Sequence, residues 1–222
     1  MTAEPLTIPV RDGETVSGLF QAPPDAYACL LLAHGAGVGM THRSMTALAD
    51  GLAGLGVATL RYQFPYMEQG RKRPDSPAVA QATVRAAAAV ALERAEGLPL
   101  FAGGRSFGGR MTSQAQAAAP LEGVRGLVFF AFPLHLAGKP AVERAAHLAE
   151  VHLPMLFVSG TRDPLADLGL LQSVVREIGP RATLQLAPDA DHSFHVPAKT
   201  GRKDADVLAE ALAATAAWIA RY

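Results

Sequence analysis

The sequence predicts an α/β protein whose core is a mostly parallel, twisted sheet with helices on both faces. Short apolar runs recur along the chain, Ala-rich segments with helical periodicity lie between them, and two segments with alternating apolar residues precede them all. Parallel strands that helices cover on both faces are typically apolar throughout, which fits these runs. At 222 residues, with no internal repeat or Ser/Gly linker, the chain is expected to form one domain over residues 1–222.

The first two strands are expected to form an antiparallel hairpin at one edge of the sheet. Residues 6–10 and 15–22 show the period of two that is typical of half-buried strands. Between them lies Asp12-Gly13, a pair that suits the tight turn of a hairpin.

Six apolar runs are predicted to be the other strands, with helices between them. The predicted strands are residues 29–33, 57–62, 98–103, 127–132, 155–159 and 183–187. Helices are expected at 77–95, 111–119 and 205–222, where alanine, the strongest helix former, is frequent. Only about twenty residues separate Phe132 from Pro154, so we expect no large lid domain there.

Composition favours a small-molecule partner. Lys plus Arg and Asp plus Glu number 20 each, so the formal net charge at pH 7 is zero. Such a chain has no long-range field to attract nucleic acid or an anionic membrane. Cys29 is the single cysteine, no apolar run approaches the ~20 residues of a membrane span, and the first residues do not resemble a signal peptide. A cytoplasmic location is expected, and the oligomeric state stays open.

Ser106 is the candidate nucleophile. It lies in Gly104-Arg105-Ser106-Phe107-Gly108, which fits the pattern Gly-x-Ser-x-Gly. In this motif a serine occupies a sharp, strained turn between a strand and a helix, and glycines on either side let the two elements approach closely. The predicted strand before the motif and the helix after it provide that setting.

His192 and Asp163 are the candidates for the base and the group that orients it. A serine hydroxyl reacts only if a base removes its proton, and a carboxylate on the other ring nitrogen holds that base in one tautomer. Asp163 follows the predicted strand at 155–159, and His192 follows the last predicted strand. The rival acids are Asp167, Asp189 and Asp191, and the neighbouring His195 is expected to point elsewhere.

The loop His34-Gly35-Ala36-Gly37 is predicted to supply an oxyanion hole. It follows the strand at 29–33, so it should reach the same edge of the sheet as Ser106. Fixed backbone N–H groups stabilise the charge that develops on a carbonyl oxygen under attack. We expect these donors to be Ala36 and Phe107, with Gly35 as an alternative to Ala36.

No cofactor or metal is expected. Gly35, Gly37 and Gly39 faintly resemble a dinucleotide-binding loop, but the third glycine has the wrong spacing, and residues 103–110 lack the Gly-Lys-Ser/Thr of a phosphate loop. The chain also contains no His-Glu-x-x-His and no cysteine pair.

Several motifs together give the chain a family resemblance. They are His34-Gly-Ala-Gly37 with Met40-Thr-His42, Arg61-Tyr-Gln-Phe-Pro-Tyr-Met67, Arg71-Lys-Arg-Pro-Asp75, Gly103-Gly-Arg-Ser-Phe-Gly-Gly-Arg-Met111, Phe132-Pro-Leu-His135, Gly160-Thr-Arg-Asp163 and Asp191-His-Ser-Phe194. The chain resembles α/β-hydrolases related to dienelactone hydrolase, and more closely the hydrolase-like domain of a testis-expressed protein and of a chromatin acetyltransferase complex subunit. The resemblance implies the α/β-hydrolase fold and the same three residues, Ser106, Asp163 and His192. Dienelactone hydrolases proper use a cysteine nucleophile, so a general esterase activity is expected here instead.

Two functions follow as hypotheses. The first is a carboxylesterase-like serine hydrolase that cleaves small esters, or thioesters, through an acyl-enzyme on Ser106. The second is a hydrolase-like module with little or no catalysis that acts by protein interaction, as some members of the resembled group do. For an enzyme, segments at the carboxyl ends of the strands should line the pocket, and His34, Tyr66 and His135 are the candidate residues.

Overall fold

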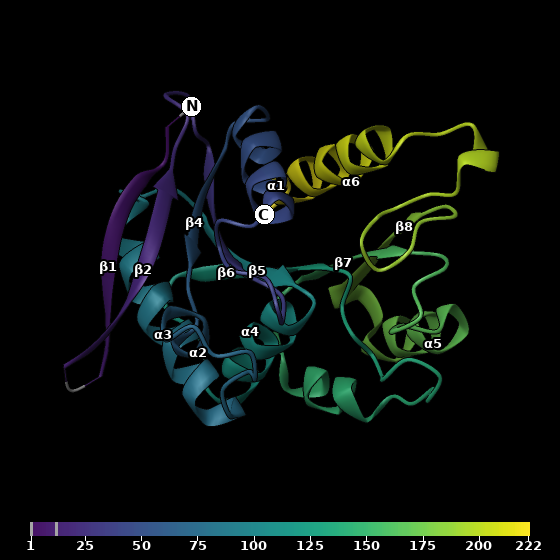
Figure 1. Ribbon diagram of the computed structural model, residues 1–222, viewed down its shortest axis with the longest axis horizontal. Coiled ribbons are helices and arrows are strands. Elements are labelled where there is room, and N and C mark those ends of the chain that lie inside the picture. Colours follow the sequence, from purple (N-terminus) through teal and green to yellow (C-terminus); the bar gives the residue numbers. More distant parts are fainter. Residues whose placement is uncertain (1, 12) are drawn as a thin grey trace.

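One eight-stranded sheet runs through the computed structural model, which describes residues 2–11 and 13–222 (Figure 1). The strand order is β1-β2-β4-β3-β5-β6-β7-β8. The strands are β1 (Glu4–Arg11), β2 (Glu14–Gln21), β3 (Ala28–Ala33), β4 (Val57–Tyr62), β5 (Leu100–Arg105), β6 (Val124–Phe130), β7 (Met155–Gly160) and β8 (Ala182–Ala187). From β4 to β8 all neighbours pair in parallel, as predicted.

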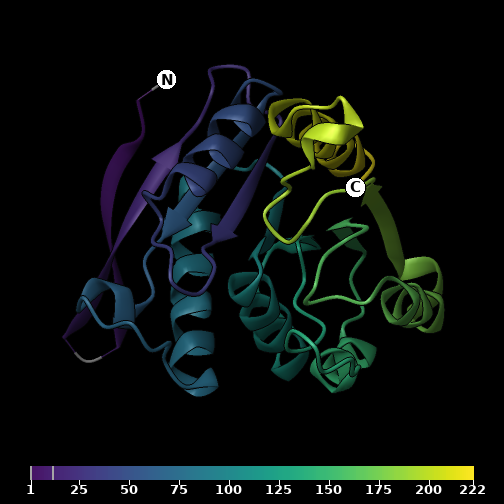
Figure 2. The ribbon, with the colours of Figure 1, turned by 45° about the vertical axis from the view of Figure 1, so that its right-hand side comes forward.

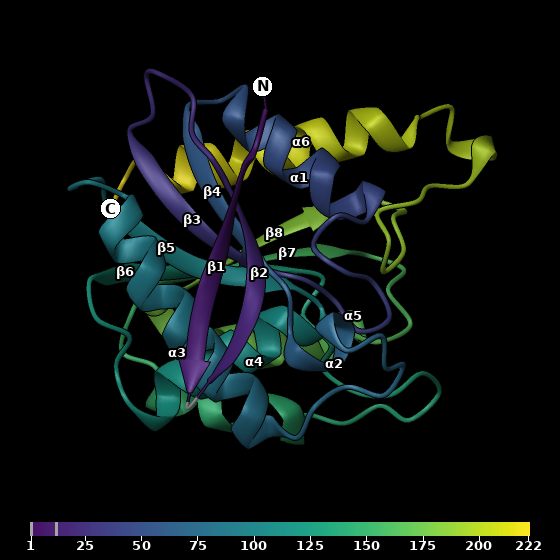
Figure 3. The same ribbon diagram turned by 60° about the vertical axis from the view of Figure 1, so that its left-hand side comes forward.

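The predicted hairpin forms one edge of the sheet. β1 pairs with β2 in antiparallel register, and β2 continues antiparallel onto β4 (Figure 3). Gly13, in the connection, has φ of 72°, a left-handed conformation that glycine adopts without steric cost. Asp12, the other half of the predicted turn, lies outside the described residues.

Helices cover both faces of the sheet. α1 (Arg43–Ala53) and α6 (Asp204–Ile219) lie against one face, while α3 (Pro77–Arg94), α4 (Phe107–Ala118) and α5 (Leu168–Ile178) lie against the other (Figure 2). The short α2 (Pro65–Glu68) follows β4. Leu30 and Leu32 of β3 point toward α1 and α6, and Leu31 points to the opposite core. This alternation gives each face an apolar core, as expected for strands buried on both sides.

The elements that flank Ser106 differ from the prediction. The strand predicted at 98–103 is β5, Leu100–Arg105, and the helix predicted at 111–119 is α4, Phe107–Ala118. Both therefore extend up to Ser106. Gly108 and Gly109 have low helix propensity, which hid the first turn of α4, but their lack of side chains lets that turn pack against β3 and β5.

Other boundaries differ by a few residues. The strand predicted at 127–132 is β6, Val124–Phe130, and it ends where Ala131 takes a left-handed φ of 55°. The helix predicted at 205–222 is α6, Asp204–Ile219. Between β6 and β7 the chain forms the 3-10 helix η1 (Glu143–Glu150) and no lid domain, which agrees with the prediction for this segment.

Candidate functional site

Ser106 is the only residue between β5 and α4. Its backbone has φ of 51° and ψ of −117°, a conformation that costs about 1–3 kcal/mol for a residue with a side chain. Two hydrogen bonds hold it there: the N–H of Ser106 donates to the carbonyl of Phe130 at 2.9 Å, and its carbonyl accepts from the N–H of Arg110 at 3.1 Å. The surrounding structure therefore imposes the strained turn that the motif predicts.

Gly104 and Gly108 let this turn lie directly against the end of β3. A Cβ on Gly104 would lie 2.4 Å from the carbonyl oxygen of Ala33, and one on Gly108 would lie 2.6 Å from the carbonyl oxygens of Ala33 and His34. These contacts are too short for any side chain. The two glycines of the motif thus bring Ser106 beside the loop that begins at His34.

A chain of hydrogen bonds joins the three residues predicted from sequence. Nε2 of His192 lies 2.8 Å from Oγ of Ser106, and Nδ1 of His192 lies 2.8 Å from Oδ2 of Asp163. If Nδ1 carries the proton, it donates to the carboxylate, and Nε2 is free to accept from the serine hydroxyl. The Asp163 side chain is fully buried, whereas 19 % of the His192 side chain is exposed.

Asp163 reaches His192 from the loop after β7. Its second oxygen, Oδ1, accepts from the N–H of Leu165 at 2.8 Å, which fixes the carboxylate plane. Asp167, the first rival, instead accepts from the N–H of Leu170 and caps the amino end of α5. Of the four candidate acids, the structure brings Asp163 to the imidazole.

The loop that carries His192 is organised by Asp191 and Asp204. Oδ1 of Asp191 accepts from the N–H groups of Ser193 and His195, at 2.7 and 3.0 Å. His195 is exposed and donates to Asp204, the first residue of α6, at 2.9 Å. This bond raises the pKa of His195. The ring of His195 thus bonds to Asp204 and helps to anchor the loop on α6, while His192 is the histidine that bonds to Ser106.

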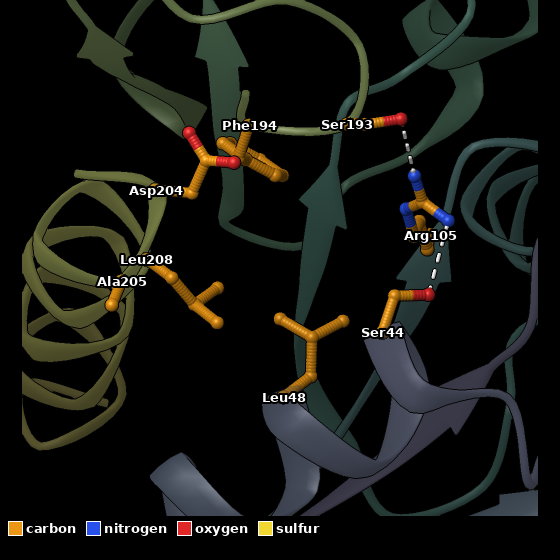
Figure 4. Close-up of a pocket in the computed structure, with 8 residues that line it drawn as sticks. All are labelled: Ser44, Leu48, Arg105, Ser193, Phe194, Asp204, Ala205 and Leu208. Carbon is orange, nitrogen blue, oxygen red and sulfur yellow. Dashed lines mark hydrogen bonds between the residues drawn. The ribbon is translucent and has the colours of Figure 1, made fainter. Parts of the chain in front are cut away.

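Arg105 was missed in the sequence analysis. Its side chain donates to Oγ of Ser44 on α1 and to Oγ of Ser193 in the His192 loop, both at 3.2 Å (Figure 4). Burial lowers the pKa of the guanidinium, and the charges of Asp191 and Asp163 oppose that shift. The sequence feature that could have indicated this role is an arginine at the end of an apolar strand. Because side chains alternate between the two faces of a strand, Arg105 lies on the face opposite Gly104.

A cleft of about 820 Å³ opens beside Ser106. Its wall includes Gly35 and Ala36 from the loop after β3, as well as Ser106 and His192. The N–H of Ala36 donates to no protein acceptor in the described residues, and Phe107 lies in the first turn of α4, where N–H groups lack a partner within the helix. A Cβ on Gly35 would lie 3.7 Å from that of Ser106. Gly35 and Phe107 are therefore adjacent to the serine, and Ala36 lines the same cleft.

The three predicted pocket residues, His34, Tyr66 and His135, do not line this cleft. All three side chains are buried. Tyr66 packs with its ring centre 6.5 Å from that of Phe107. This prediction must be corrected: residues from α1, from the His192 loop and from α6 form the wall, together with Arg105.

The rings of His34 and His135 lie inside the protein, where each forms hydrogen bonds with one backbone carbonyl and one backbone N–H group. Nδ1–H of His34 donates to the Gly35 carbonyl at 2.9 Å, while Nε2 accepts from the N–H of Phe64 at 3.1 Å. His135 repeats this arrangement with the Leu136 carbonyl and the N–H of Asp167. The His34 ring is therefore a neutral link between loops, and His135 also joins two separate segments of the chain. Burial lowers the pKa of His34 to about 4.

Arg61 and Arg71, which belong to the motifs of the family resemblance, have structural partners. Arg61 is buried and donates to Gln21, to Thr46 and to the Met40 carbonyl. Arg71 forms an ion pair with Asp75 at 2.7 Å. Neither lines the cleft beside Ser106.

A search of residues 2–11 and 13–222 finds no group of three or more His, Cys, Asp or Glu side chains placed to hold a metal ion. Over the same residues, no helix combines the length and apolar character needed to cross a membrane.

The fold and the hydrogen-bonded serine define an α/β-hydrolase. Residues 26–220 match the model of the α/β hydrolase domain family, so the chain belongs to that family.

Solved structures with a similar fold span nearly the whole chain. A dienelactone hydrolase from Anabaena variabilis matches with a TM-score of 0.79 at 20% identity, covering 100% of this chain and 98% of that one. An α/β serine hydrolase homologue from Coxiella burnetii matches with a TM-score of 0.76 at 21% identity, covering 96% of each chain. A lidless α/β serine hydrolase from Xanthomonas campestris matches with a TM-score of 0.74 at 23% identity, covering 98% of this chain and 95% of that one.

Proposed function

We propose that this protein is a serine hydrolase that cleaves small carboxylic esters, with thioesters as a second substrate type, through an acyl-enzyme on Ser106. The observation that carries the proposal is the continuous hydrogen-bond chain from Asp163 through His192 to Ser106, with 2.8 Å at each link. A serine on a strained turn, a base within reach and a buried carboxylate behind the base form the arrangement that activates a hydroxyl.

In the first step Oγ of Ser106 attacks the ester carbonyl carbon. His192 takes the hydroxyl proton on Nε2 as the new C–O bond forms, and Asp163 stabilises the resulting imidazolium. The electron pair of the carbonyl moves to its oxygen. The N–H groups of Ala36 and Phe107 stabilise that charge, with Gly35 as the alternative donor, and a single such donor contributes about 10²- to 10³-fold to the rate.

The next steps release the alcohol and then the acid. The tetrahedral intermediate collapses, its bond to the alkoxide or thiolate breaks, and His192 returns its proton to the leaving group. Water then attacks the acyl-enzyme while His192 accepts one of its protons. The bond to Oγ of Ser106 breaks, and His192 returns that proton to Oγ. The products are a carboxylic acid and the restored serine.

The proposed substrates are small esters, which fit within the cleft of about 820 Å³ beside Ser106. The dienelactone hydrolase and the serine hydrolases of similar fold support a hydrolytic reaction in general terms. With serine rather than cysteine at the nucleophile position, we propose general ester hydrolysis instead of dienelactone hydrolysis. We propose that its partner is a small-molecule ester rather than a nucleic acid or a membrane, and that it acts in the cytoplasm.

Labelling with a fluorophosphonate probe tests the role of Ser106. The wild type is expected to react covalently and to hydrolyse p-nitrophenyl acetate, whereas Ser106→Ala does neither. Ser173→Ala, which removes a hydroxyl from α5, is the matched control and should behave like the wild type. Labelling that persists in Ser106→Ala would remove that residue from the mechanism.

A folded wild type that resists the probe and co-purifies with a stoichiometric partner would instead support the second hypothesis, a protein-interaction module. That hypothesis comes from the resemblance to the testis-expressed protein and the acetyltransferase subunit.

A further inference from the structure

A second, smaller cavity of about 150 Å³ adjoins the cleft at Ser106 and lies between α1 and α6 (Figure 4). Its walls are mainly apolar: Leu48 comes from α1, Ala205 and Leu208 come from α6, and Phe194 comes from the His192 loop. Figure 4 shows the side chains of Leu48, Phe194 and Leu208 facing one another across the space. The proposed ester hydrolysis does not by itself require such a cavity.

The cavity is continuous with the cleft. Ser44, Arg105 and Ser193 line both spaces, as do Asp204 and Leu208. Arg105, the residue directly before Ser106, bridges the two serines at this shared boundary. A molecule held at Ser106 can therefore extend a short group past the guanidinium and into the cavity.

The size and lining of the cavity define the group it can take. A cavity of about 150 Å³ with a mainly apolar surface has the right volume for a benzene molecule, and its polar residues, Ser44, Arg105, Ser193 and Asp204, lie at the boundary with the cleft. A phenyl ring or a linear chain of about four to six carbons would fill a similar volume. A group that extends past Arg105 and Asp204, which lie at the boundary, meets Leu48, Phe194 and Leu208. A charged group would lose its hydration against these three side chains, which favours an apolar group there.

Phe194 connects this cavity to the base. It lies two residues after His192, is only 5 % exposed, and has a left-handed φ of 61°. An aromatic residue keeps such a conformation only where its surroundings hold it. A ligand in the cavity would contact the ring and stabilise the loop that carries His192.

We propose that this cavity is the subsite for the apolar end of the ester substrate, which is a phenyl group or a chain of about four to six carbons. The inference rests on the proposed esterase function and names its substrate class. Each methylene buried in the subsite contributes about 0.8 kcal/mol, so kcat/KM should rise about fourfold per methylene until the cavity is full.

A chain-length series tests the subsite. One arm uses p-nitrophenyl esters from acetate to decanoate, and the other uses acetates of alcohols from ethanol to decanol. We expect kcat/KM of the wild type to peak at about four to six carbons in one arm, which identifies the acyl or the alcohol side as the occupant.

Variants of α6 make the test specific. Ala205→Leu should lower the ratio of kcat/KM for the six-carbon substrate to that for the two-carbon substrate at least tenfold. Leu208→Ala should move the optimum to a longer chain. Ala213→Leu makes the same change at another exposed position of α6, one that does not line the cavity, and should keep the wild-type ratio. An unchanged ratio in Ala205→Leu, in both arms of an active enzyme, would overturn the inference.

Binding without turnover separates this inference from the proposed function. In Ser106→Ala, titration with hexan-1-ol or benzene should shift the methyl NMR signals of Leu48 and Leu208, and Ala205→Leu in the same background should abolish the shifts. If the wild type cleaves no ester but these shifts occur, the esterase proposal fails while the apolar subsite stands. If neither probe shifts the signals, the subsite is wrong even when esters are cleaved.

Discussion

Arg105 and Ser193, 88 residues apart in the chain, are joined by a hydrogen bond of 3.2 Å from Nη2 to Oγ. Arg105 directly precedes the proposed nucleophile Ser106, and Ser193 directly follows the proposed base His192. A second bond of the same guanidinium, to Ser44, fastens this connection to α1. Arg105 is thus placed to fix the position of the His192 loop relative to Ser106.

Loss of the Arg105 bridge is expected to reduce catalysis more than binding. Arg105→Met should lower kcat for p-nitrophenyl acetate roughly tenfold, because the loop with His192 loses a support and small displacements slow the reaction. Arg105→Lys should recover part of the loss. In a double-mutant cycle, Ser193→Ala should add little to Arg105→Met, since Arg105→Met already removes the hydrogen bond that Ser193→Ala removes. Fully additive effects would show that the two side chains act independently.

Substitution of the orienting carboxylate tests the proposed acid. Asp163→Asn should lower kcat by about 10⁴-fold, because an amide favours the wrong tautomer of His192. The matched control is Asp167→Asn, for which we expect nearly wild-type activity and stability, since Asn caps a helix about as well as Asp. Steady-state kinetics on both variants provide the comparison. Comparable activity in the two variants would contradict the assignment of Asp163.

The contact between Gly104 and β3 predicts a large structural effect for a single methyl group. Gly104→Ala would place a Cβ 2.4 Å from the carbonyl oxygen of Ala33, so the turn must move. We expect a loss of roughly 1–3 kcal/mol in the free energy of unfolding, measured with urea, together with slower fluorophosphonate labelling. Gly169→Ala on α5, where the new Cβ meets only Asp167 at 3.4 Å, should be neutral or stabilising. Equal stability of the two variants would argue against the close approach.

The pKa values of His34 and His195 are expected to be shifted in opposite directions from that of a free histidine. Burial lowers the pKa of His34 to about 4, while the hydrogen bond to Asp204 raises the pKa of His195. NMR titration of the ring signals should therefore give His34 a lower midpoint than His195. The reverse order would mean that His34 is not the buried, neutral link described above.

The pKa of His34 also predicts how stability depends on pH. Because the unfolded state binds the proton near pH 6.5 and the folded state only near pH 4, this group has no effect above about pH 6.5. Between about pH 6.5 and 4 it destabilises the fold progressively, by a total of about 3 kcal/mol. Urea unfolding at several pH values, with His34→Asn as control, measures this contribution. An equally steep fall in the variant would assign the pH dependence to other groups.

Sequence patterns alone determined the architecture and three principal residues of the candidate site. Apolar runs of strand length predict parallel strands, and the carboxyl ends of such strands meet at one edge of a sheet, so residues that follow different strands can converge. For this reason Ser106, Asp163 and His192 could be selected from their positions after predicted strands. The structure brings them together, while their roles in catalysis stay predictions.

Only the tertiary structure decided which way the other polar side chains point. Local pattern could not show that His34 and His135 turn inward, because that depends on backbone N–H and carbonyl groups supplied by distant segments. Nor could it show the bridge from Arg105 to Ser44 and Ser193, because these residues come from separate parts of the chain. The same holds for the apolar cavity between α1 and α6, which separate parts of the chain also form. The period of a strand or helix fixes which face a residue occupies, but the partner on that face comes from packing.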